Sequence, residues 1–369
     1  MSWTNGERSR RSLGAETGPN TNHRIRALLR CGVVGAVATA AITTACSHPG
    51  ASLESAPDVE VWLTGAALHE PVWSYRMHAL VALTEDHRLA EVTAGDHGNG
   101  AQTRLSAPLA VGRNLQISRK DAAVVFVPQP DRGRVAAVDL QSLRQVNDFD
   151  AGPAPAYLSE DAGLRMLLAL SSDGKSVTPV DQYGYRKLPI AITDGTADSI
   201  DGTNRGRELD YHLYGSSGIR HFQGTTSPAA QRGSLDMDVA VSAGDGTAVT
   251  RSYVAGHEDN TVSAVDSRRG GEGLEVLAST RLPAPVRELG TDDTRIYAAT
   301  DHELVTLQTA SFTGFPDRRI PVVGTIDYRS GLTSAARAAH LSGMAVGPHR
   351  VYLTFADAPY VVSVPKPRL

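Results

Sequence analysis

The strongest constraint on the fold of this chain is a short alternating pattern that returns at nearly equal steps. Segments such as RVAAVDL at 134–140, TVSAVDS at 261–267 and ELVTLQT at 303–309 alternate apolar residues with small or polar ones, which is the period of a half-buried strand. Seven copies occur, with steps of 46, 42, 42, 43, 42 and 57 residues between their last core apolar positions: Val92, Val138, Val180, Phe222, Val265, Leu307 and Val364. A repeat of this length is typical of solenoids and propellers.

A second strand-like series precedes the first in the same register, for example AVVFVP at 123–128 and RIYAAT at 295–300. Each pair of segments is typical of a β-hairpin with a short polar turn. The unit is then a four-stranded antiparallel blade. We therefore predict an all-β domain at 58–369, a seven-bladed β-propeller of four-stranded antiparallel blades. The long last step holds the Ala-rich stretch Ser334–His340, which we expect as a short helix inserted between the sixth and seventh blades.

One strand-like segment, Val59–Thr64, is left over ahead of the first blade. A propeller has to pair its first and last strands, because an open edge strand invites aggregation. We predict that the ring closes when this N-terminal strand pairs with the last blade.

The first 45 residues are typical of a signal peptide. Residues 1–30 carry six arginines and two glutamates, and the next fifteen, CGVVGAVATAAITTA, carry no charge. Fifteen residues fall short of the roughly 20 that a bilayer-spanning helix needs. Thr44 and Ala45 then precede Cys46.

This junction resembles a bacterial lipobox, and the resemblance implies cleavage before Cys46 and attachment of lipid, such as palmitate, to its thiol. Residues 46–57 would then be the lipidated cysteine and a flexible tether. An uncleaved N-terminal anchor or a signal without lipid are the alternatives. All three interpretations predict an extracytoplasmic propeller. The lipid on Cys46 or the uncleaved anchor would attach it to the cell membrane.

Cleavage leaves 30 basic and 38 acidic residues, a formal charge of −8 against −4 for the whole chain. An acidic protein is a poor candidate for nucleic acid binding. Cleavage also removes Cys31, which leaves Cys46 alone and excludes a disulfide. We expect a monomer stabilised by its core.

The segment SYVAGHEDNTVSAVD at 252–266 resembles the YVTN repeat, and Val124–Asp139 is a second match. The resemblance implies a β-propeller of the bacterial envelope. Propellers with these repeats include surface-layer proteins, lactonases, quinoprotein-like dehydrogenases and metal chaperones, and a fold by itself does not define an activity.

Three histidines occupy comparable hairpin positions in the first, fifth and sixth blades: His87, His257 and His302. Each lies beside one or two carboxylates, which are ligand types suited to zinc. If their loops face a common centre they form a zinc site. If they do not, they are solvated turn residues, and no other cofactor is indicated.

No residues are identified as catalytic. The chain has no G-x-S-x-G elbow, and carboxylate pairs such as Glu160-Asp161 are expected in solvated turns. The leading hypothesis is a non-enzymatic envelope lipoprotein that binds a protein or a small ligand through a propeller face. The alternatives are a zinc-binding accessory protein or chaperone of an envelope ABC transporter, and a propeller-type lactonase or hydrolase.

Overall fold

The computed structural model describes residues 59–95, 101–118, 120–203, 206–245, 251–267, 273–311, 314–330 and 332–367. The expected signal peptide, Cys46 and the tether lie outside the described residues.

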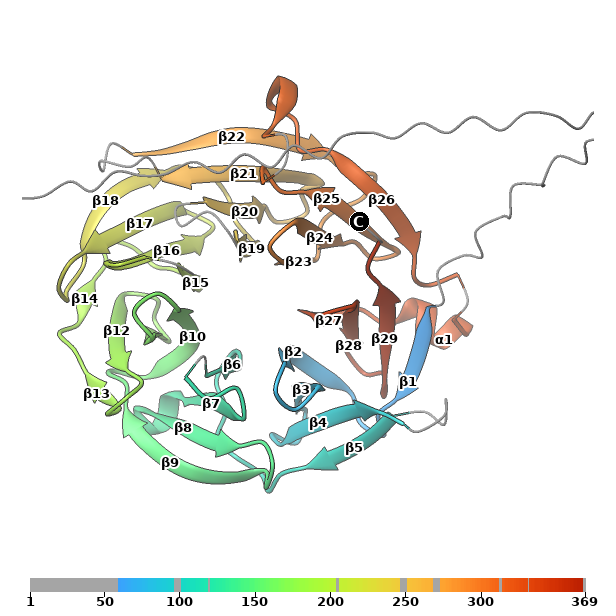
Figure 1. Cartoon of the computed structure of the whole chain (residues 1–369), viewed down its shortest axis with the longest axis horizontal. Coiled ribbons are helices and arrows are strands. Elements are labelled where there is room, and N and C mark those ends of the chain that lie inside the picture. The colour runs from blue at the N-terminus through green and yellow to red at the C-terminus, as the bar shows by residue number, and fades with distance from the viewer. Residues whose placement is uncertain are drawn as a thin grey trace, which may run out of the picture. The chain divides into compact units, whose positions relative to one another are not determined.

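Seven antiparallel sheets surround a central axis, as the sequence predicts (Figure 1). The first three blades consist of β2 (Leu68–Ser74), β3 (Ala79–Thr84), β4 (Leu89–Ala94) and β5 (Ala101–Leu105); β6 (Gln116–Ile117), β7 (Val124–Gln129), β8 (Arg134–Asp139) and β9 (Arg144–Asp150); and β10 (Pro155–Asp161), β11 (Met166–Ser171), β12 (Ser176–Asp181), β13 (Arg186–Lys187) and β14 (Ala191–Ile192).

The next three blades consist of β15 (Ser199–Gly202), β16 (Leu209–Gly215), β17 (Gly218–Gly224) and β18 (Ala230–Leu235); β19 (Val241–Gly244), β20 (Arg251–Ala255), β21 (Thr261–Ser267) and β22 (Leu274–Arg281); and β23 (Glu288–Thr291), β24 (Arg295–Ala299), β25 (Glu303–Gln308) and β26 (Val322–Asp327). The seventh combines β27 (Leu341–Val346), β28 (Arg350–Phe355) and β29 (Tyr360–Pro365) with β1 (Glu60–Leu63). The two repeated sequence patterns are the second and third strands of every blade.

The N-terminal strand closes the ring as predicted. β1 pairs antiparallel with β29 in a register that sets Glu60 opposite Ser363 and Leu63 opposite Tyr360. Trp62 points inward, is 7% exposed, and its ring centroid lies 5.2 Å from that of Tyr352 on β28. Leu63 points outward and is 70% exposed. The first and last segments of the chain therefore stabilise one sheet together.

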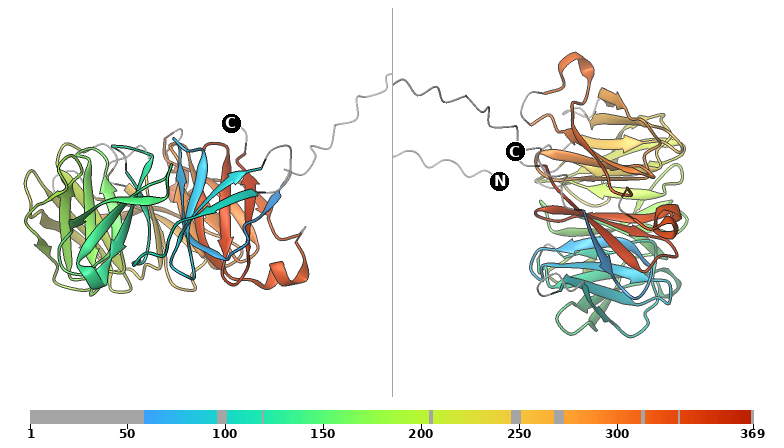
Figure 2. Two further views of the ribbon diagram at one scale, coloured as in Figure 1. Left: turned by 90° about the horizontal axis from the view of Figure 1, so that it is seen from below. Right: turned by 90° about the vertical axis from the view of Figure 1, so that its right-hand side faces the viewer.

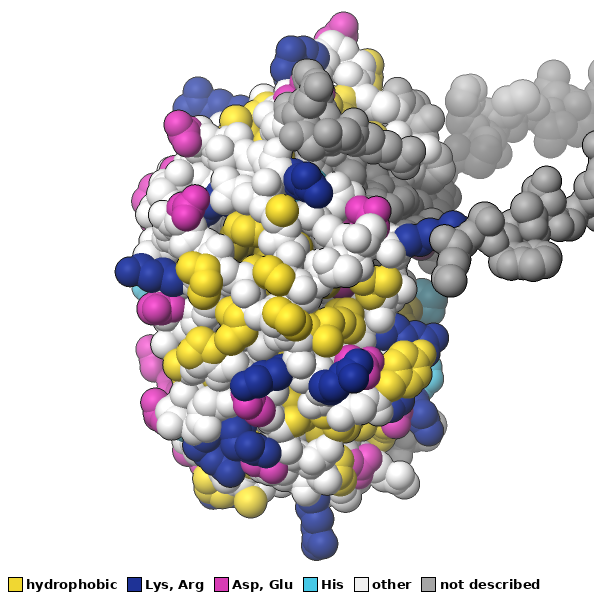
Figure 3. Space-filling model, turned by 90° about the vertical axis from the view of Figure 1, so that its left-hand side faces the viewer, with side chains coloured by type: hydrophobic (Ala, Val, Ile, Leu, Met, Phe, Trp, Pro, Cys, Tyr) yellow, Lys and Arg dark blue, Asp and Glu magenta, His cyan; other side chains and the backbone are white. Residues whose placement is uncertain are grey.

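Blade three departs from the four-strand pattern, because its outer strand is split into β13 and β14, which both pair with β12. Pro189 lies between the two pieces and has no N–H to continue a ladder. Ile192 on β14 is 72% exposed. Figure 3 shows the rim on this side of the molecule, where hydrophobic side chains form a band between groups of charged ones.

The predicted insertion before blade seven contains helix α1 (Ser334–Ala338), and the hydroxyl of Thr333 accepts a hydrogen bond from the Ala336 N–H at its start. The side chain of Arg329 is buried and donates to the carbonyl oxygens of Ala336 and Arg337, at 3.1 and 2.9 Å. Its guanidinium also lies 4.8 Å from the centroid of the Phe355 ring. A buried arginine thus fixes the insertion to blade seven. Two 3₁₀ turns lie elsewhere in the described residues, η2 (Pro130–Arg132) and η3 (Pro316–Arg318).

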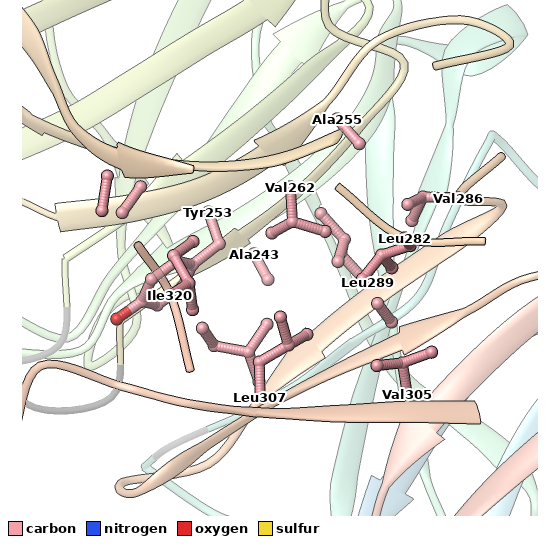
Figure 4. Close-up of a cluster of buried hydrophobic side chains, with 14 residues drawn as sticks. Ala243, Tyr253, Ala255, Val262, Leu282, Val286, Leu289, Val305, Leu307 and Ile320 are labelled. Atoms are coloured by element: carbon pink, nitrogen blue, oxygen red, sulfur yellow. The ribbon is translucent and has the colours of Figure 1, made fainter. Parts of the chain in front are cut away.

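The hydrophobic core lies between neighbouring blades. In the cluster between blades five and six, Val262 on β21 faces Leu289 on β23 and Leu307 on β25 (Figure 4). Because every blade packs on two neighbours in this way, the ring holds its shape without a disulfide.

Antiparallel blades give the ring two distinct faces. The hairpin face carries the turns between second and third strands, such as 85–88 and 257–260, and the connections between blades. The terminal face carries the turns between first and second strands, such as 75–78 and 292–294. β1 begins and β29 ends on the terminal face, whereas α1 projects on the hairpin face (Figure 2, left).

Candidate functional site

The innermost strands of the blades bring acidic side chains toward the central axis. Glu70 lies on β2, Asp201 on β15 and Glu288 on β23, and all three are half-buried. Burial raises the pKa of Tyr157 on β10, and the charges of these three carboxylates raise it further. Tyr157 and the three carboxylates belong to the innermost strands of four separate blades, and these strands border the central axis (Figure 1). We call Glu70, Asp201 and Glu288 the axial carboxylates.

The axial carboxylates resist ionisation. Burial, followed by the charge of Glu70, raises the pKa of Glu288 to about 8. Burial alone raises the pKa of Glu70 to about 7. Burial raises the pKa of Asp201 to about 6 against opposing hydrogen bonds, one of them donated by Ser242 Oγ at 3.1 Å. At neutral pH the Glu288 carboxyl is therefore mostly protonated.

Glu70 is held in a backbone conformation that is unfavourable for a glutamate. Its φ is +50°, and it lies in a bulge of β2 between His69 and Val72, directly before Pro71. Such a conformation persists only where the surroundings enforce it. Here Gly343 of β27 leaves the space that Pro71 fills. Blade seven therefore fixes the position of an axial carboxylate of blade one.

Two axial carboxylates lack partners of their own. Within the described part of the chain, the side-chain carboxyl group of neither Glu70 nor Glu288 makes a hydrogen bond or an ion pair. A cationic group on the axis would supply the missing partner and favour the ionised carboxylates. The arrangement is thus suited to binding a cation, an amine or a basic side chain.

The three histidines proposed for zinc lie in the predicted hairpin turns of the hairpin face. His87 follows β3, His257 follows β20 and His302 follows β24, and all three are exposed. Among the residues that the structure describes, no group of three or more His, Cys, Asp or Glu side chains is placed to hold a metal ion. The zinc prediction therefore gains no support from the geometry.

The carboxylates beside two of these histidines serve contacts between elements. Arg287, which precedes β23, donates to Glu258 at 2.6 Å and to Asp301 at 3.1 Å, and so joins the hairpin turns of blades five and six. His257 Nδ1 lies 2.8 Å from Asp238 Oδ1, in the connection that leads into blade five. These interactions bind neighbouring blades to one another.

The expectation that Glu160 and Asp161 lie in a solvated turn is wrong. Both belong to β10 and are buried, at 6% and 0% exposure. Asp161 accepts hydrogen bonds from the backbone N–H groups of Leu164 and Asp210, at 3.0 and 3.1 Å. Burial nevertheless raises the pKa of Asp161 to about 6. The pair is part of the polar interior of blade three. The expectation was wrong because acidic residues at the end of a strand resemble a polar turn in sequence.

Sequence reasoning also missed the axial carboxylates. The first strands of the blades have no repeated pattern, so neither Asp201 nor Glu288 stands out. The dipeptide Glu70-Pro71 inside a strand-like segment was the available signal, because proline within a strand marks an edge or a bulge.

Comparisons with known proteins support the fold. No protein-family model matches the chain, and no curated protein does. Among solved structures, the chain is similar to U3-55K with a TM-score of 0.61 and 11% identity, covering 84% of this chain and 98% of that one. It is similar to the RRP9 WD40 repeats with a TM-score of 0.60 and 12% identity over 84% and 99%, and to a chain of the Mitotic Checkpoint Complex with 0.65 and 12% over 92% and 100%.

These likenesses establish a seven-bladed propeller of WD40-like architecture, and at such identities they carry no function. The resemblance to YVTN repeats stays a prediction. No helix in the described ranges is long and apolar enough to cross a bilayer.

Proposed function

We propose that this protein is an extracytoplasmic, membrane-anchored lipoprotein whose propeller is a binding scaffold without catalytic activity of its own. The lipid on Cys46 and the tether at 46–57 hold it at the cell membrane. The hairpin face binds an envelope protein or a small ligand.

The observation that carries this proposal is the position of the chain ends on the ring. β1 begins on the terminal face, so an anchor that precedes it connects to that face. The hairpin face carries seven turns between second and third strands, and neither end of the described part of the chain lies on it. A tethered propeller can therefore present its hairpin face to a partner while the terminal face connects to the membrane. A closed, densely packed ring is a rigid platform for such turns.

The axial carboxylates indicate the chemistry of one contact. Because Glu70 and Glu288 are half-buried at the axis and have no cationic partner among the described residues, we expect a basic side chain or an amine of the bound molecule to reach them. Binding of that group would shift both carboxyl groups toward ionisation and release protons.

The anchor is tested by expressing the full chain and a Cys46→Ala variant in a bacterial host fed an alkyne-tagged fatty acid. We expect label and a chain shortened by cleavage before Cys46 for the natural protein, and neither for the variant. Label retained by Cys46→Ala would refute lipidation at this residue, and an unlabelled natural chain of full length at the membrane would favour the uncleaved anchor.

The binding face is tested with matched surface substitutions. Ser217→Arg and Glu85→Arg place bulky charge on the hairpin face, whereas Asp293→Arg and Gln141→Arg do so on the terminal face, and all four positions are exposed. Partners cross-linked in envelope preparations should disappear with the first pair and persist with the second. The opposite result would place binding on the terminal face, and loss of no partner with either pair would refute a face-specific scaffold.

The zinc-binding accessory protein and the lactonase or hydrolase stay predictions that no observation in the described structure favours. Metal analysis and a lactone and ester panel at neutral pH are the corresponding tests.

A further inference from the structure

A polar pocket of about 390 Å³ lies on the terminal face between blades six and seven. Its polar lining comes from the turn after β23, the start of β24, the turn after β27 and the residue that follows β29: Asp292, Thr294, Arg295, Tyr297, His349 and Lys366. We call it the blade 6–7 pocket. It lies on the face opposite the proposed partner surface, and its size suits a small molecule.

The one carboxylate of the pocket is already saturated. Asp292 Oδ1 accepts hydrogen bonds from the backbone N–H groups of Thr294 and Arg295, both at 2.9 Å. Asp292 Oδ2 accepts from Tyr297 Oη at 2.8 Å and from Lys366 Nζ at 2.7 Å. Asp292 therefore has little capacity left for a ligand, and its role is to position Lys366.

Lys366 retains donor capacity. Its side chain is only 12% exposed, and Asp292 is the single hydrogen-bond partner of its ammonium group among the described residues. The ammonium also lies 5.2 Å from the centroid of the Tyr297 ring. An ammonium has three N–H donors and no acceptor, so a buried lysine favours a further acceptor beside it. The open volume of the pocket is where that acceptor can bind.

The other polar groups of the pocket also favour an acceptor. Arg295 is a permanent cation that lines the pocket, and its Nη1 donates to the carbonyl oxygen of Thr294 at 3.1 Å. The imidazole of exposed His349 can add another donor. The pocket is therefore lined by one lysine, one arginine and one carboxylate whose oxygens already accept hydrogen bonds, although the chain as a whole has a formal charge of −4.

We propose that the blade 6–7 pocket binds an oxyanion, the phosphate or carboxylate group of a small ligand, between Lys366 and Arg295. The saturated Asp292 carboxylate and the remaining N–H donors of Lys366 select a group that only accepts hydrogen bonds. Charge-assisted hydrogen bonds to oxyanions are about twice as strong as neutral ones, which favours such a group over a neutral ligand.

The test is calorimetric titration of the detergent-solubilised full chain at low ionic strength with three probes, inorganic phosphate, glycerol 3-phosphate and succinate. Saturable binding of at least one probe is expected, and the probe that binds tells phosphate from carboxylate. Absence of saturable binding for all three would overturn the proposal.

Two variants locate the site. Arg295→Gln removes one cation, and the double variant Asp292→Asn/Lys366→Gln removes the other while it keeps the local charge balance. Each should weaken binding about tenfold, the loss expected for one charge-assisted hydrogen bond. Arg144→Gln, at an exposed position at the start of β9, should leave binding unchanged. Equal affinity in the natural chain and both pocket variants would place the anion elsewhere and refute the inference.

Discussion

Gly343 of β27 and Pro71 of β2 interlock across the junction of the last and first blades. A β-carbon on Gly343 would lie 2.2 Å from Pro71 Cδ and 3.2 Å from the Glu70 nitrogen, and the φ of Gly343 is +154°. The glycine therefore makes room for the bulge that directs Glu70 toward the axis. Ring closure and the geometry of an axial carboxylate depend on the same contact.

Gly343→Ala is expected to destabilise the protein, because the proline ring and the backbone beside it cannot yield easily. We expect a loss of about 1–3 kcal/mol in the free energy of unfolding, typical of overpacking in a dense core. Gly324→Ala on β26 is the control, because a β-carbon there meets nothing within 4 Å. Urea denaturation of both variants measures the difference, and equal stability would contradict the interlock.

The closing strand is tested by two neighbouring residues on opposite sides of β1. Trp62→Ala removes a buried ring and should cost about 3–5 kcal/mol. Leu63→Ala removes a side chain that is 70% exposed and should change stability by less than about 0.5 kcal/mol. Thermal unfolding should show a large shift for the first variant only. Comparable shifts would mean that β1 does not pack as described.

Stability should fall as pH rises from about 5 to 8. The pKa of Glu288 is about 8 in the folded protein against an ordinary value of 4.5, so the folded state keeps a proton that the unfolded chain releases. The resulting stabilisation is complete below pH 4.5 and is lost as pH rises through 8. The raised pKa values of Glu70, about 7, and Asp201, about 6, also make the free energy of unfolding fall as pH rises, over ranges that end at lower pH.

Glu288→Gln should flatten this dependence and leave the variant more stable than the natural protein at pH 8.5. Denaturation in urea at pH 5.5, 7.0 and 8.5 measures it. Glu85→Gln, in an exposed turn of the hairpin face, should keep the natural profile. A steep profile retained by Glu288→Gln would show that other groups dominate.

Zinc binding gives a separate prediction. If the hairpin histidines form a site, purified protein loaded with zinc and dialysed should retain it stoichiometrically, and His257→Ala or His302→Ala should reduce the amount. Because Asp238 already engages His257 and no metal-binding group is present in the described ranges, we expect only weak zinc retention. Stoichiometric zinc that depends on both histidines would reverse this expectation.

The second and third strands of the blades could be predicted from sequence because each is buried on both sides between neighbouring blades. Val125 and Val138, for example, face each other across β7 and β8 and are both fully buried. This burial demands the same apolar pattern in every repeat. The insertion that contains α1 could be predicted because it lengthens one repeat. Closure of the ring by β1 could be predicted because one strand-like segment was left over after seven blades had been assigned.

The first strands escaped prediction because their lengths differ and their polar residues face the axis. β6 has two residues and β23 four, too few for a period to emerge. β2 has seven residues, but the bulge at Glu70 interrupts its alternation. Neither Glu70 nor Glu288 therefore had a pattern to mark it. The zinc prediction had a similar weakness, because comparable turns lie around a ring, and similarity of position in the repeat does not bring side chains together.

The sequence alone determined the number of blades, their hairpins and the closure of the ring, since the apolar period and the repeat length follow directly from burial between equal sheets. Only the tertiary structure decided which polar side chains meet. Residues separated by one or more blades, such as Glu70 and Glu288, interact across the axis, and Asp292 meets Lys366 from the next blade. Such contacts depend on the curvature of the closed ring, which no local pattern encodes.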